Sequence, residues 1–512
     1  MQSQVSKLPI IEKVGYAMGD AAANLVWRGA LAYLAVFYTD TFGLTAAAAA
    51  MLFLVVRLSD GITDIIMGMI ADRTESRWGK FRPWILFSTP LLGLFMVLCF
   101  TTPDWSASNK LIYAYVTYIG LTLCYTLNNV PYSALMGVMT ECDVERTSLS
   151  AYRFAGAFLG GLLVMGFLPY FVDLFGQGND VQGYQSTMYL FAGLLVGLMV
   201  FTFLSTKERV KPVINNSTGL KTELWDLSKN LPFILFPLMS ITAFFYYRNL
   251  ITGICFAVVM LGTWLLIKRF LAKPREQISS TQQDMIDLIT NKPWLILLGM
   301  GFLTMMFNGI KYGVIAYYFK YVIGDELMTG QFFVALLVVS IFGALSTSYL
   351  ARIFGRRLLF IGSLLIGSGF TACFYWIPEG NVTLVFVLGC CAEFCAAIFP
   401  TLFFSMLGDS ADYSEWKNGR RATGLVYSAG TFVQKTGGGF AGALVLVVLS
   451  SYGYDGMNPS TVADSLPGIK LLMSWIPAFF GVAAAILMLF YPITDKQQQR
   501  ITLELKGQRA LV

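Results

Sequence analysis

Three charged residues share one apolar stretch, "FLVVRLSDGITDIIMG", which runs from Phe53 to Gly68. Arg57, Asp60 and Asp64 are spaced by three and four positions, so a helix would carry all three on one face. Charges at membrane depth are costly and usually face an interior cavity. The two carboxylates could bind a hard cation such as Na⁺ or carry a proton, with Arg57 as their charge partner. An internal salt bridge that only holds helices together is the alternative, although it leaves the second aspartate unexplained.

A second polar face lies in "GDAAANLVWRGALAY", where Asp20, Asn24 and Arg28 follow one another at intervals of four. A carboxylate and an amide accept hydrogen bonds from sugar hydroxyl groups, and the neighbouring ring of Trp27 offers a flat apolar surface. A structural pair between Asp20 and Arg28 is the alternative, but the two residues are two helical turns apart. We therefore predict that this face binds substrate.

Two later segments add polar residues at membrane depth. "CYTLNNVPYSAL" places Thr126 and Asn129 shortly before Pro131. A proline inside a span frees a backbone carbonyl that a neighbour or a ligand must satisfy. Arg153 follows in "AYRFAGAFLGG" and either reaches the substrate or extends its charge to the membrane surface.

The second half of the chain contributes Lys311 in "FNGIKYGVIAYY", Glu393, and Lys435 in "GTFVQKTGGGF". A lysine at membrane depth without a counterion is costly. We therefore expect Lys435 to meet Asp60 or Asp64 across the two halves of the protein.

The composition indicates the class of protein that must position these residues. Of 512 residues, 56% are hydrophobic and 13% are charged, whereas about a quarter of a soluble domain is charged. Many apolar runs reach the roughly 20 residues that a membrane helix needs. The sequence predicts an all-α polytopic membrane protein. Because the chain has no histidine, a proton relay would use carboxylates or lysine. No metal-ligand spacing or nucleophile–base motif suggests an enzyme, and we expect no cofactor and no nucleic-acid partner.

Fourteen apolar segments are predicted, and basic residues gather in every second loop and in both tails. This distribution predicts that both termini are cytoplasmic in a multi-pass bacterial inner-membrane protein. Residues 1–205 and 293–495 are predicted to form two six-helix bundles, the plan of the major facilitator fold. The linker, 206–292, should add a transmembrane hairpin at about 231–271, or a hairpin on the bilayer surface, and 496–512 should be a cytoplasmic tail.

Two loops mix both signs of charge, "DRTESRWGKFR" and "SADYSEWKNGRR". Topology and helix capping explain the basic residues but not the acidic residues between them. We predict ion pairs that open and close between the halves, because exposed ion pairs are individually weak. The predicted cytoplasmic gate consists of Arg73, Arg77, Lys80, Arg82, Asp409, Asp412 and Glu415.

Several segments together resemble one transporter family. They are "YAMGDAAANL", "FYTDTFGL", "FLVVRLSDGITDIIMG", "DRTESRWGKFRPW", "NNVPYSAL" and "GDSADYSEWKNGRRATGLVYSAGTFVQKTGG". The chain is similar in these segments to the glycoside–pentoside–hexuronide:cation symporters of the melibiose-permease type. The resemblance covers residues 8–205 and 286–495, and the inserted hairpin departs from it.

The resemblance implies roles for individual residues. Asp20 and Arg153 match sugar-binding positions, and Asp60, Asp64 and Thr126 match cation-binding positions. Arg57 matches the arginine before the two aspartates, and Lys435 matches a lysine between cation and sugar. The chain departs from the melibiose-permease pattern at Asn129 and Ser133, where that pattern has an aspartate and a tryptophan. A preference for galactosides is therefore not implied.

These observations predict a cation-coupled importer of a glycoside, pentoside or uronide, working as a monomer in the lipid bilayer with Na⁺ or H⁺ as coupling ion. The basic residues Arg28, Arg57, Arg153, Lys311 and Lys435 outnumber the interior acids. This excess suggests a substrate with a carboxylate, held by Arg28 or Lys311. A lipid or lysolipid transporter of the same fold and a non-transporting membrane sensor remain alternatives.

Overall fold

The fold is described from a computed structural model of the chain. It describes residues 7–44, 46–210, 258, 261–262, 280–325, 328–378, 380–453 and 462–510. The predicted hairpin at about 231–271 lies outside the described residues, apart from three isolated positions. The predicted roles of Arg57 and Asp60 concern side chains that also lie outside the described part.

Within the described residues the chain is helical and contains no strand. The first group of helices is α1 (Ile10–Val36), η1 (Phe37–Thr41), α2 (Ala46–Arg73), α3 (Arg82–Cys99), α4 (Ala107–Met139), α5 (Asp143–Gly176) and α6 (Asp180–Ser205). The second group is α9 (Ser280–Ile289), α10 (Lys292–Tyr318), η3 (Phe319–Ile323), α11 (Met328–Phe354), α12 (Arg356–Cys373), η4 (Phe374–Trp376), α13 (Val382–Asn418), α14 (Thr423–Ser451), α15 (Val462–Met473), α16 (Trp475–Met488) and α17 (Asp495–Ala510).

Nine helical segments among the described residues are long and apolar enough to cross a membrane. One of these segments, Ser465–Met488, consists of most of α15 followed by α16. Helices α1, α2 and α4 have 27, 28 and 33 residues but are not among the nine. These three helices carry most of the polar residues that the sequence singled out, which is the expected signature of spans that line an interior site.

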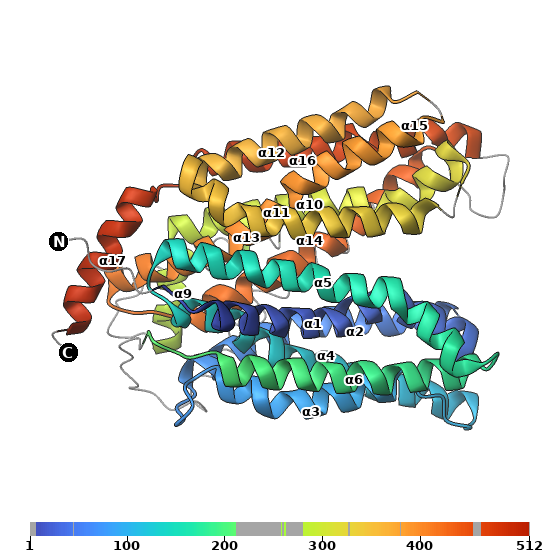
Figure 1. Ribbon diagram of the computed structural model, residues 1–512, viewed down its shortest axis with the longest axis horizontal. Coiled ribbons are helices and arrows are strands. Elements are labelled where there is room, and N and C mark those ends of the chain that lie inside the picture. The colour runs from blue at the N-terminus through green and yellow to red at the C-terminus, as the bar shows by residue number, and fades with distance from the viewer. Residues whose placement is uncertain are drawn as a thin grey trace.

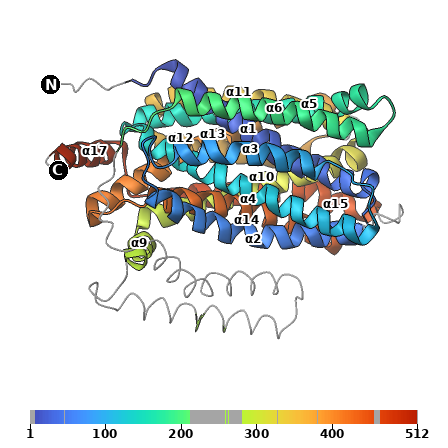
Figure 2. The ribbon, with the colours of Figure 1, turned by 90° about the horizontal axis from the view of Figure 1, so that it is seen from below.

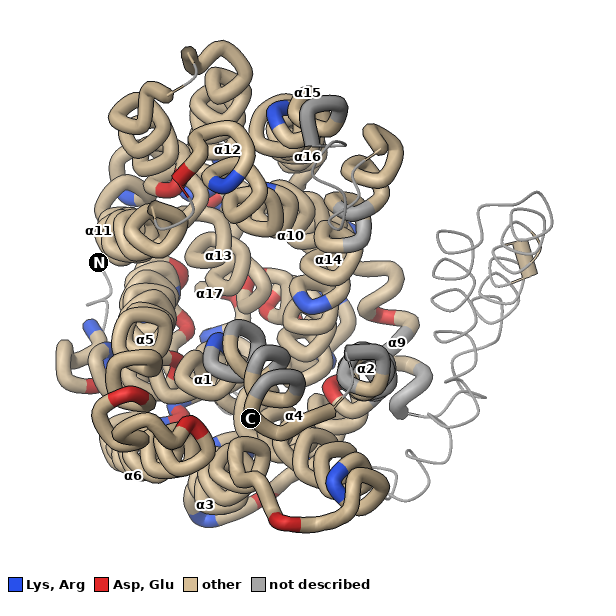
Figure 3. Tube along the Cα trace, turned by 90° about the vertical axis from the view of Figure 1, so that its right-hand side faces the viewer, with Lys and Arg blue, Asp and Glu red and all other residues tan. Residues whose placement is uncertain are grey.

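The helices form two layers (Figure 1). Helices α1 to α6 lie together, α10 to α16 lie together, and both chain ends are at one end of the molecule. We call this end the termini side. Viewed along the helices, α5 lies beside α11 and α2 beside α14, and these pairs join the two groups (Figure 3). Helix α9 lies at the termini side of the second group, where it packs on α10 and α13 (Figure 2).

Two corresponding loops, "SRWGKFRPW" (76–84) in the first group and "ARIFGRR" (351–357) in the second, are built in the same way. In the first group Gly79 has φ +106°, and the Glu208 carboxylate accepts hydrogen bonds from three backbone N–H groups at the start of α3. In the second group Gly355 has φ +79°, and Asp495 accepts from the backbone N–H of Arg356 at the start of α12. In both groups a carboxylate after the last span satisfies the N–H groups at a helix start, and glycine supplies the left-handed turn.

Candidate functional site

A buried aspartate joins three helices at the contact between the two groups. Asp64 of α2 is 0% exposed and accepts a 2.9 Å hydrogen bond from the Thr126 hydroxyl of α4. Lys435 of α14 places its Nζ atom 3.0 Å from Oδ1 and 2.8 Å from Oδ2 of the same carboxylate. The predicted contact of Lys435 with an aspartate of the other half is therefore present, and Asp64 is the described member of the predicted cation pair.

Two aromatic rings flank this ion pair. Trp27 of α1 and Tyr125 of α4 are stacked, with ring centroids 5.4 Å apart at an angle of 23°. The Lys435 ammonium lies 5.8 Å from the Trp27 centroid and 5.9 Å from the Tyr125 centroid, within reach of both ring faces. Because both rings are only half-buried, they offer a flat surface directly beside the charged pair.

A second buried ion pair lies on the termini side of these rings. Asp20 of α1 accepts a 3.0 Å hydrogen bond from Nε of Arg153, and Arg153 Nη2 donates to the Ser133 hydroxyl at 3.0 Å. Helices α1 and α5 approach so closely here that a Cβ atom at Gly156 would lie 2.1 Å from the carbonyl oxygen of Ala17. The approach therefore requires glycine at this position. This approach lets the α5 arginine reach the α1 aspartate.

The Arg153 guanidinium is also enclosed by rings, including Phe404 of α13 with its centroid 4.3 Å away. Its Nη1 atom is buried and has no hydrogen-bond partner among the described residues. Asn129 is 8% exposed and lies one helical turn before Ser133 on α4. The predicted substrate residues Asp20, Asn129 and Arg153 are thus buried and lie on α1, α4 and α5.

Asn24 and Arg28 continue the α1 face away from the termini side. The Asn24 amide donates to the Asp20 carbonyl at 2.9 Å, and Arg28 Nε lies 3.4 Å from Asn24 Oδ1. Within the described residues Arg28 makes no ion pair, although its side chain is only half-exposed. It therefore keeps most of its five donors available for a ligand.

Lys311, the other predicted carboxylate clamp, is already paired. Its Nζ atom lies 2.6 Å from Oε2 of Glu393, and the two residues are both 3% exposed. Among the side chains that the structure describes, Lys311 is paired with an acid and Arg28 is not, a difference that the sequence alone could not reveal.

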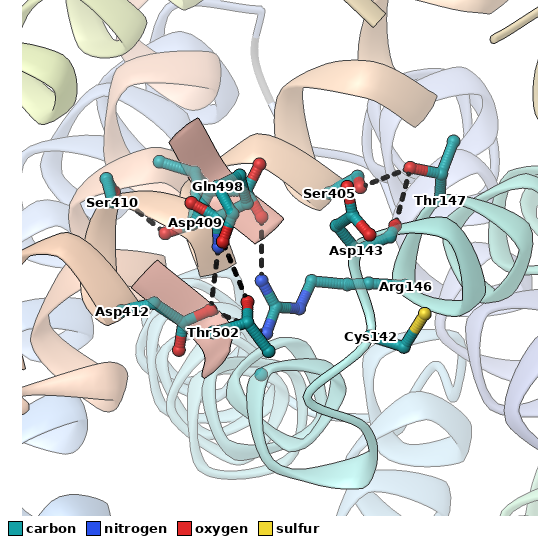
Figure 4. Close-up of polar contacts among 12 residues, drawn as sticks. Cys142, Asp143, Arg146, Thr147, Ser405, Asp409, Ser410, Asp412, Gln498 and Thr502 are labelled. Carbon is teal, nitrogen blue, oxygen red and sulfur yellow. Dashed lines mark hydrogen bonds and ion pairs between the residues drawn. The ribbon is translucent and has the colours of Figure 1, made fainter. Parts of the chain in front are cut away.

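The termini side is closed by buried ion pairs between the two groups, which we call the termini-side network (Figure 4). Arg146 of α5 is 0% exposed and contacts Asp409 at 2.8 Å and Asp412 at 2.9 Å, both on α13. Gln498 of α17 donates to the same Asp412 oxygen at 3.2 Å. One arginine of the first group therefore holds two acids of the second.

Two arginines of the second group complete the termini-side network. Arg356 contacts Asp409 at 2.6 Å and reaches Asp143 of the first group at 3.3 Å. Arg421 pairs with Asp412 and donates to the carbonyl of Gly137 in the first group at 2.8 Å.

The predicted gate acids Asp409, Asp412 and Glu415 all belong to this network, with Glu415 3.0 Å from Arg421. Their described partners are Arg146, Arg356 and Arg421 rather than the predicted basic residues. No spacing rule joins Arg146 to acids 263 and 266 positions away, or Arg356 to an acid 53 positions away. Arg421, by contrast, follows Asp412 and Glu415 by nine and six positions in the loop "SADYSEWKNGRR", and that spacing could have identified it.

The predicted basic residues of the gate make contacts within the first group. Arg82 donates to the carbonyls of Trp78 and Phe203, Lys80 to the carbonyl of Asp72, and Arg73 to the carbonyl of Met69.

Arg77, the fourth of them, stacks on the Trp78 ring. Burial lowers the pKa of the Lys80 ammonium, while the nearby carboxylates of Asp72 and Glu75 act in the opposite direction.

Asp72, at the end of α2, makes a further contact between the groups. Its carboxylate accepts a 2.7 Å hydrogen bond from the N–H of Gly424 and a 3.1 Å bond from the N–H of Leu425, both in the first turn of α14. The residue before α14, Ala422, provides no side-chain cap. Asp72 therefore caps a helix of the other group and interacts favourably with its dipole.

Helix α17 covers the termini-side network from outside. Ile501 and Leu505 are 1% and 2% exposed. Glu504 accepts a 2.6 Å hydrogen bond from the Trp416 indole, and Lys506 lies 3.6 Å from Glu141 of the first group.

Comparison with known proteins identifies the family. The family described as MFS/sugar transport protein matches residues 15–259 and 227–495. The chain is 31% identical to the putative glycoside/cation symporter YagG of Escherichia coli strain K12, over 99% of this chain and 97% of that protein. It is 30% identical to the isoprimeverose transporter of Lactiplantibacillus pentosus, over 98% of this chain and 92% of that protein.

Among solved structures, the proton:xylose symporter XylE has a similar fold, with a TM-score of 0.56 and 15% identity over 96% of this chain and 98% of that chain. The predicted major facilitator fold is thereby confirmed. The chain is a multi-pass membrane protein that belongs to the MFS sugar transporters and, among them, to the glycoside–pentoside–hexuronide:cation symporters.

Proposed function

We propose that the protein imports a sugar or sugar acid together with Na⁺ or H⁺ by alternating access across the bacterial inner membrane, with both termini in the cytoplasm. Residues 1–205 and 293–495 are the two halves that move against each other, and a single chain suffices for transport. The observation that carries this proposal is the Asp64–Thr126–Lys435 contact, which joins the halves at a buried carboxylate beside two half-buried rings.

Coupling follows from competition at Asp64. A cation or proton that neutralises this carboxylate weakens its hold on Lys435, since the two charges are only 2.8 Å apart in a site shielded from water. The released ammonium, still close to Trp27 and Tyr125, can then donate to a substrate that rests on those rings. Each ligand therefore raises the affinity of the site for the other. Asp60 is proposed as the second cation-binding carboxylate.

The substrate class is inferred from Arg28. A half-exposed arginine that makes no ion pair within the described part of the chain, next to the ring pair, is suited to bind a carboxylate with two parallel hydrogen bonds. Asp20 and Asn129 would form hydrogen bonds with substrate hydroxyl groups, and the ion pair with Arg153 would hold the Asp20 carboxylate in position. We infer that a uronide binds more tightly than the corresponding neutral glycoside or pentoside.

The termini-side network supports an assignment of this conformation within the proposed transport cycle. Arg146, Arg356 and Arg421 bridge the halves on that side with buried contacts. If that side is cytoplasmic, as the basic loops predict, the conformation described here is closed to the cytoplasm. Cytoplasmic release of substrate then requires these pairs to separate and to be solvated.

The test is the melting temperature of the purified protein with methyl β-D-glucuronide, methyl β-D-glucoside and methyl β-D-xyloside, with and without Na⁺. Ligands that bind only the folded state raise the melting temperature by mass action. We expect the glucuronide to give the largest rise, and Arg28→Gln to weaken its affinity roughly 10- to 150-fold, the range for hydrogen bonds to a charged group. Lys311→Gln is the comparison for the other predicted clamp. Because it leaves the buried Glu393 carboxylate without its ammonium partner, we expect it to lower the melting temperature of the ligand-free protein.

Equal rises with all three compounds, unchanged by Arg28→Gln, would contradict an acidic substrate but not sugar transport. A panel in which no sugar raises the melting temperature while lysolipids do would contradict the proposed function and support the lipid-transporter alternative.

A further inference from the structure

The second half contains a buried polar cluster that the coupling scheme does not use. The Glu393 carboxylate of α13 is 3% exposed. Its Oε2 atom accepts from Lys311 at 2.6 Å, and its Oε1 atom accepts from the Tyr312 hydroxyl at 2.8 Å and the Ser340 hydroxyl at 2.8 Å. Lys311 and Tyr312 lie on α10 and Ser340 lies on α11, so three helices converge on one carboxylate.

Tyr312 differs from the other members of this cluster. Lys311 and Ser340 are 3% and 0% exposed, whereas Tyr312 is half-buried. Its ring is held in place by Phe333 of α11, with centroids 5.9 Å apart and an interplanar angle of 7°. The buried carboxylate thus fixes the hydroxyl of a tyrosine whose remaining surface is accessible.

Tyr312 lies near a charged residue of the first half. Arg28 of α1 is close enough to Tyr312 for a direct Coulomb interaction, although the two residues belong to different halves. Arg28 in turn follows Trp27, whose ring stacks on Tyr125. Tyr312 therefore lies within Coulomb range of the proposed substrate face on α1, which Arg28 belongs to.

The hydrogen bond to Glu393 also sets the polarity that Tyr312 presents. A carboxylate can only accept, so the single phenolic proton is donated to Glu393. The phenolic oxygen keeps its lone pairs and can accept a hydrogen bond from a ligand. Arg28 can only donate hydrogen bonds. The second half therefore offers an acceptor at Tyr312, and the first half offers donors at Arg28.

We propose that Tyr312 is a specificity-determining residue of the second half, whose phenolic oxygen accepts a hydrogen bond from a substrate hydroxyl group. Glu393 is its positioning residue, held by Lys311 and Ser340. This inference rests on the proposed sugar-transport function. It adds a residue of the second half that contacts the substrate directly. A sugar acid would bridge the halves with its carboxylate on Arg28 and a hydroxyl on Tyr312, which favours closure around the complete substrate.

The first experiment measures the affinity of Tyr312→Phe for methyl β-D-glucuronide and its monodeoxy analogues by calorimetry. This substitution keeps the ring and removes the oxygen. We expect roughly 3- to 10-fold weaker binding of the parent glucuronide, as for loss of one hydrogen bond between neutral groups. One monodeoxy analogue should bind wild type and Tyr312→Phe equally, because it lacks the hydroxyl that Tyr312 reads.

Ser340→Ala separates substrate contact from a structural role. It removes a hydrogen bond to the same Glu393 oxygen from a side chain that no ligand can reach. We expect it to lower the melting temperature without discriminating among the analogues. Equal affinity of wild type and Tyr312→Phe for every compound, or an identical pattern for Tyr312→Phe and Ser340→Ala, would overturn the proposal.

A second experiment does not depend on the ligand. Tyr312→Cys should react with a membrane-impermeant methanethiosulfonate reagent added from the periplasmic side, and Ser340→Cys should not, as read by mass spectrometry against the native cysteines. An unreactive Tyr312→Cys protein with a normal melting temperature would overturn the proposal. A panel without any sugar ligand would instead contradict the proposed function, so the two failures are distinct.

Discussion

The contact of Asp72 with the first turn of α14 gives the sharpest test of how the termini side opens and closes. Both hydrogen bonds, at 2.7 and 3.1 Å, join one half to the other and exist only while this side is closed. Asp72→Asn keeps one acceptor oxygen and a similar volume but removes the negative charge. The substitution should therefore destabilise the closed conformation without preventing folding of either half.

The expected size follows from the geometry. Asp72→Asn removes one of the two acceptor oxygens, which costs about 0.5–1.5 kcal/mol. It also removes a negative charge that interacts with the α14 dipole by about 0.3–1 kcal/mol. Once this side opens, water solvates both the side chain and the α14 N–H groups. The substitution therefore changes the free energy of the open conformation only slightly. A net change of about 1–2 kcal/mol corresponds to a roughly 5- to 30-fold shift toward the conformation open on the termini side.

Cys142 is a native reporter for this equilibrium. It is half-buried immediately before α5, four residues before Arg146 of the termini-side network (Figure 4). We expect a maleimide to alkylate Cys142 several-fold faster in Asp72→Asn, measured by mass spectrometry. Asp173→Asn, an exposed charge at the opposite end of α5, is the matched control and should leave the rate unchanged. Equal rates in Asp72→Asn and wild type would refute the capping argument.

Three further predictions concern coupling and stability. Asp64→Asn should retain the fold but abolish sugar accumulation against a gradient; accumulation in proteoliposomes that survives this change would contradict the coupling scheme. Deleting residues 496–512 removes Gln498 from the termini-side network and should speed alkylation of Cys142, whereas an unchanged rate would show that α17 does not stabilise closure. Glu208→Ala leaves three N–H groups at the start of α3 without their acceptor and should lower the melting temperature more than the conservative Glu208→Gln.

Some features follow from the sequence because they depend on residues close together in the chain. The four-residue spacing of Asp20, Asn24 and Arg28 fixes them on one face of α1 wherever that helix packs. The cost of an unpaired lysine at membrane depth was enough to predict that Lys435 needs a carboxylate, and Asp64 provides it. Apolar segment length likewise determined the all-α membrane fold.

Other features depend on which distant segments the fold brings together, and only the tertiary structure decided them. An excess of basic residues made Lys311 and Arg28 equivalent candidates for a carboxylate clamp. The structure separates them because α13 delivers Glu393 to Lys311, 82 positions away, while Arg28 makes no ion pair with any acid whose side chain is described.

The same holds for the termini side. The sequence singled out the acids Asp409 and Asp412, but their partner Arg146 lies 263 and 266 positions away. Charge pattern shows which residues need a partner, because burial without one is costly. The choice of partner is made where helices from the two halves meet, and that geometry is a property of the fold rather than of any local stretch of sequence.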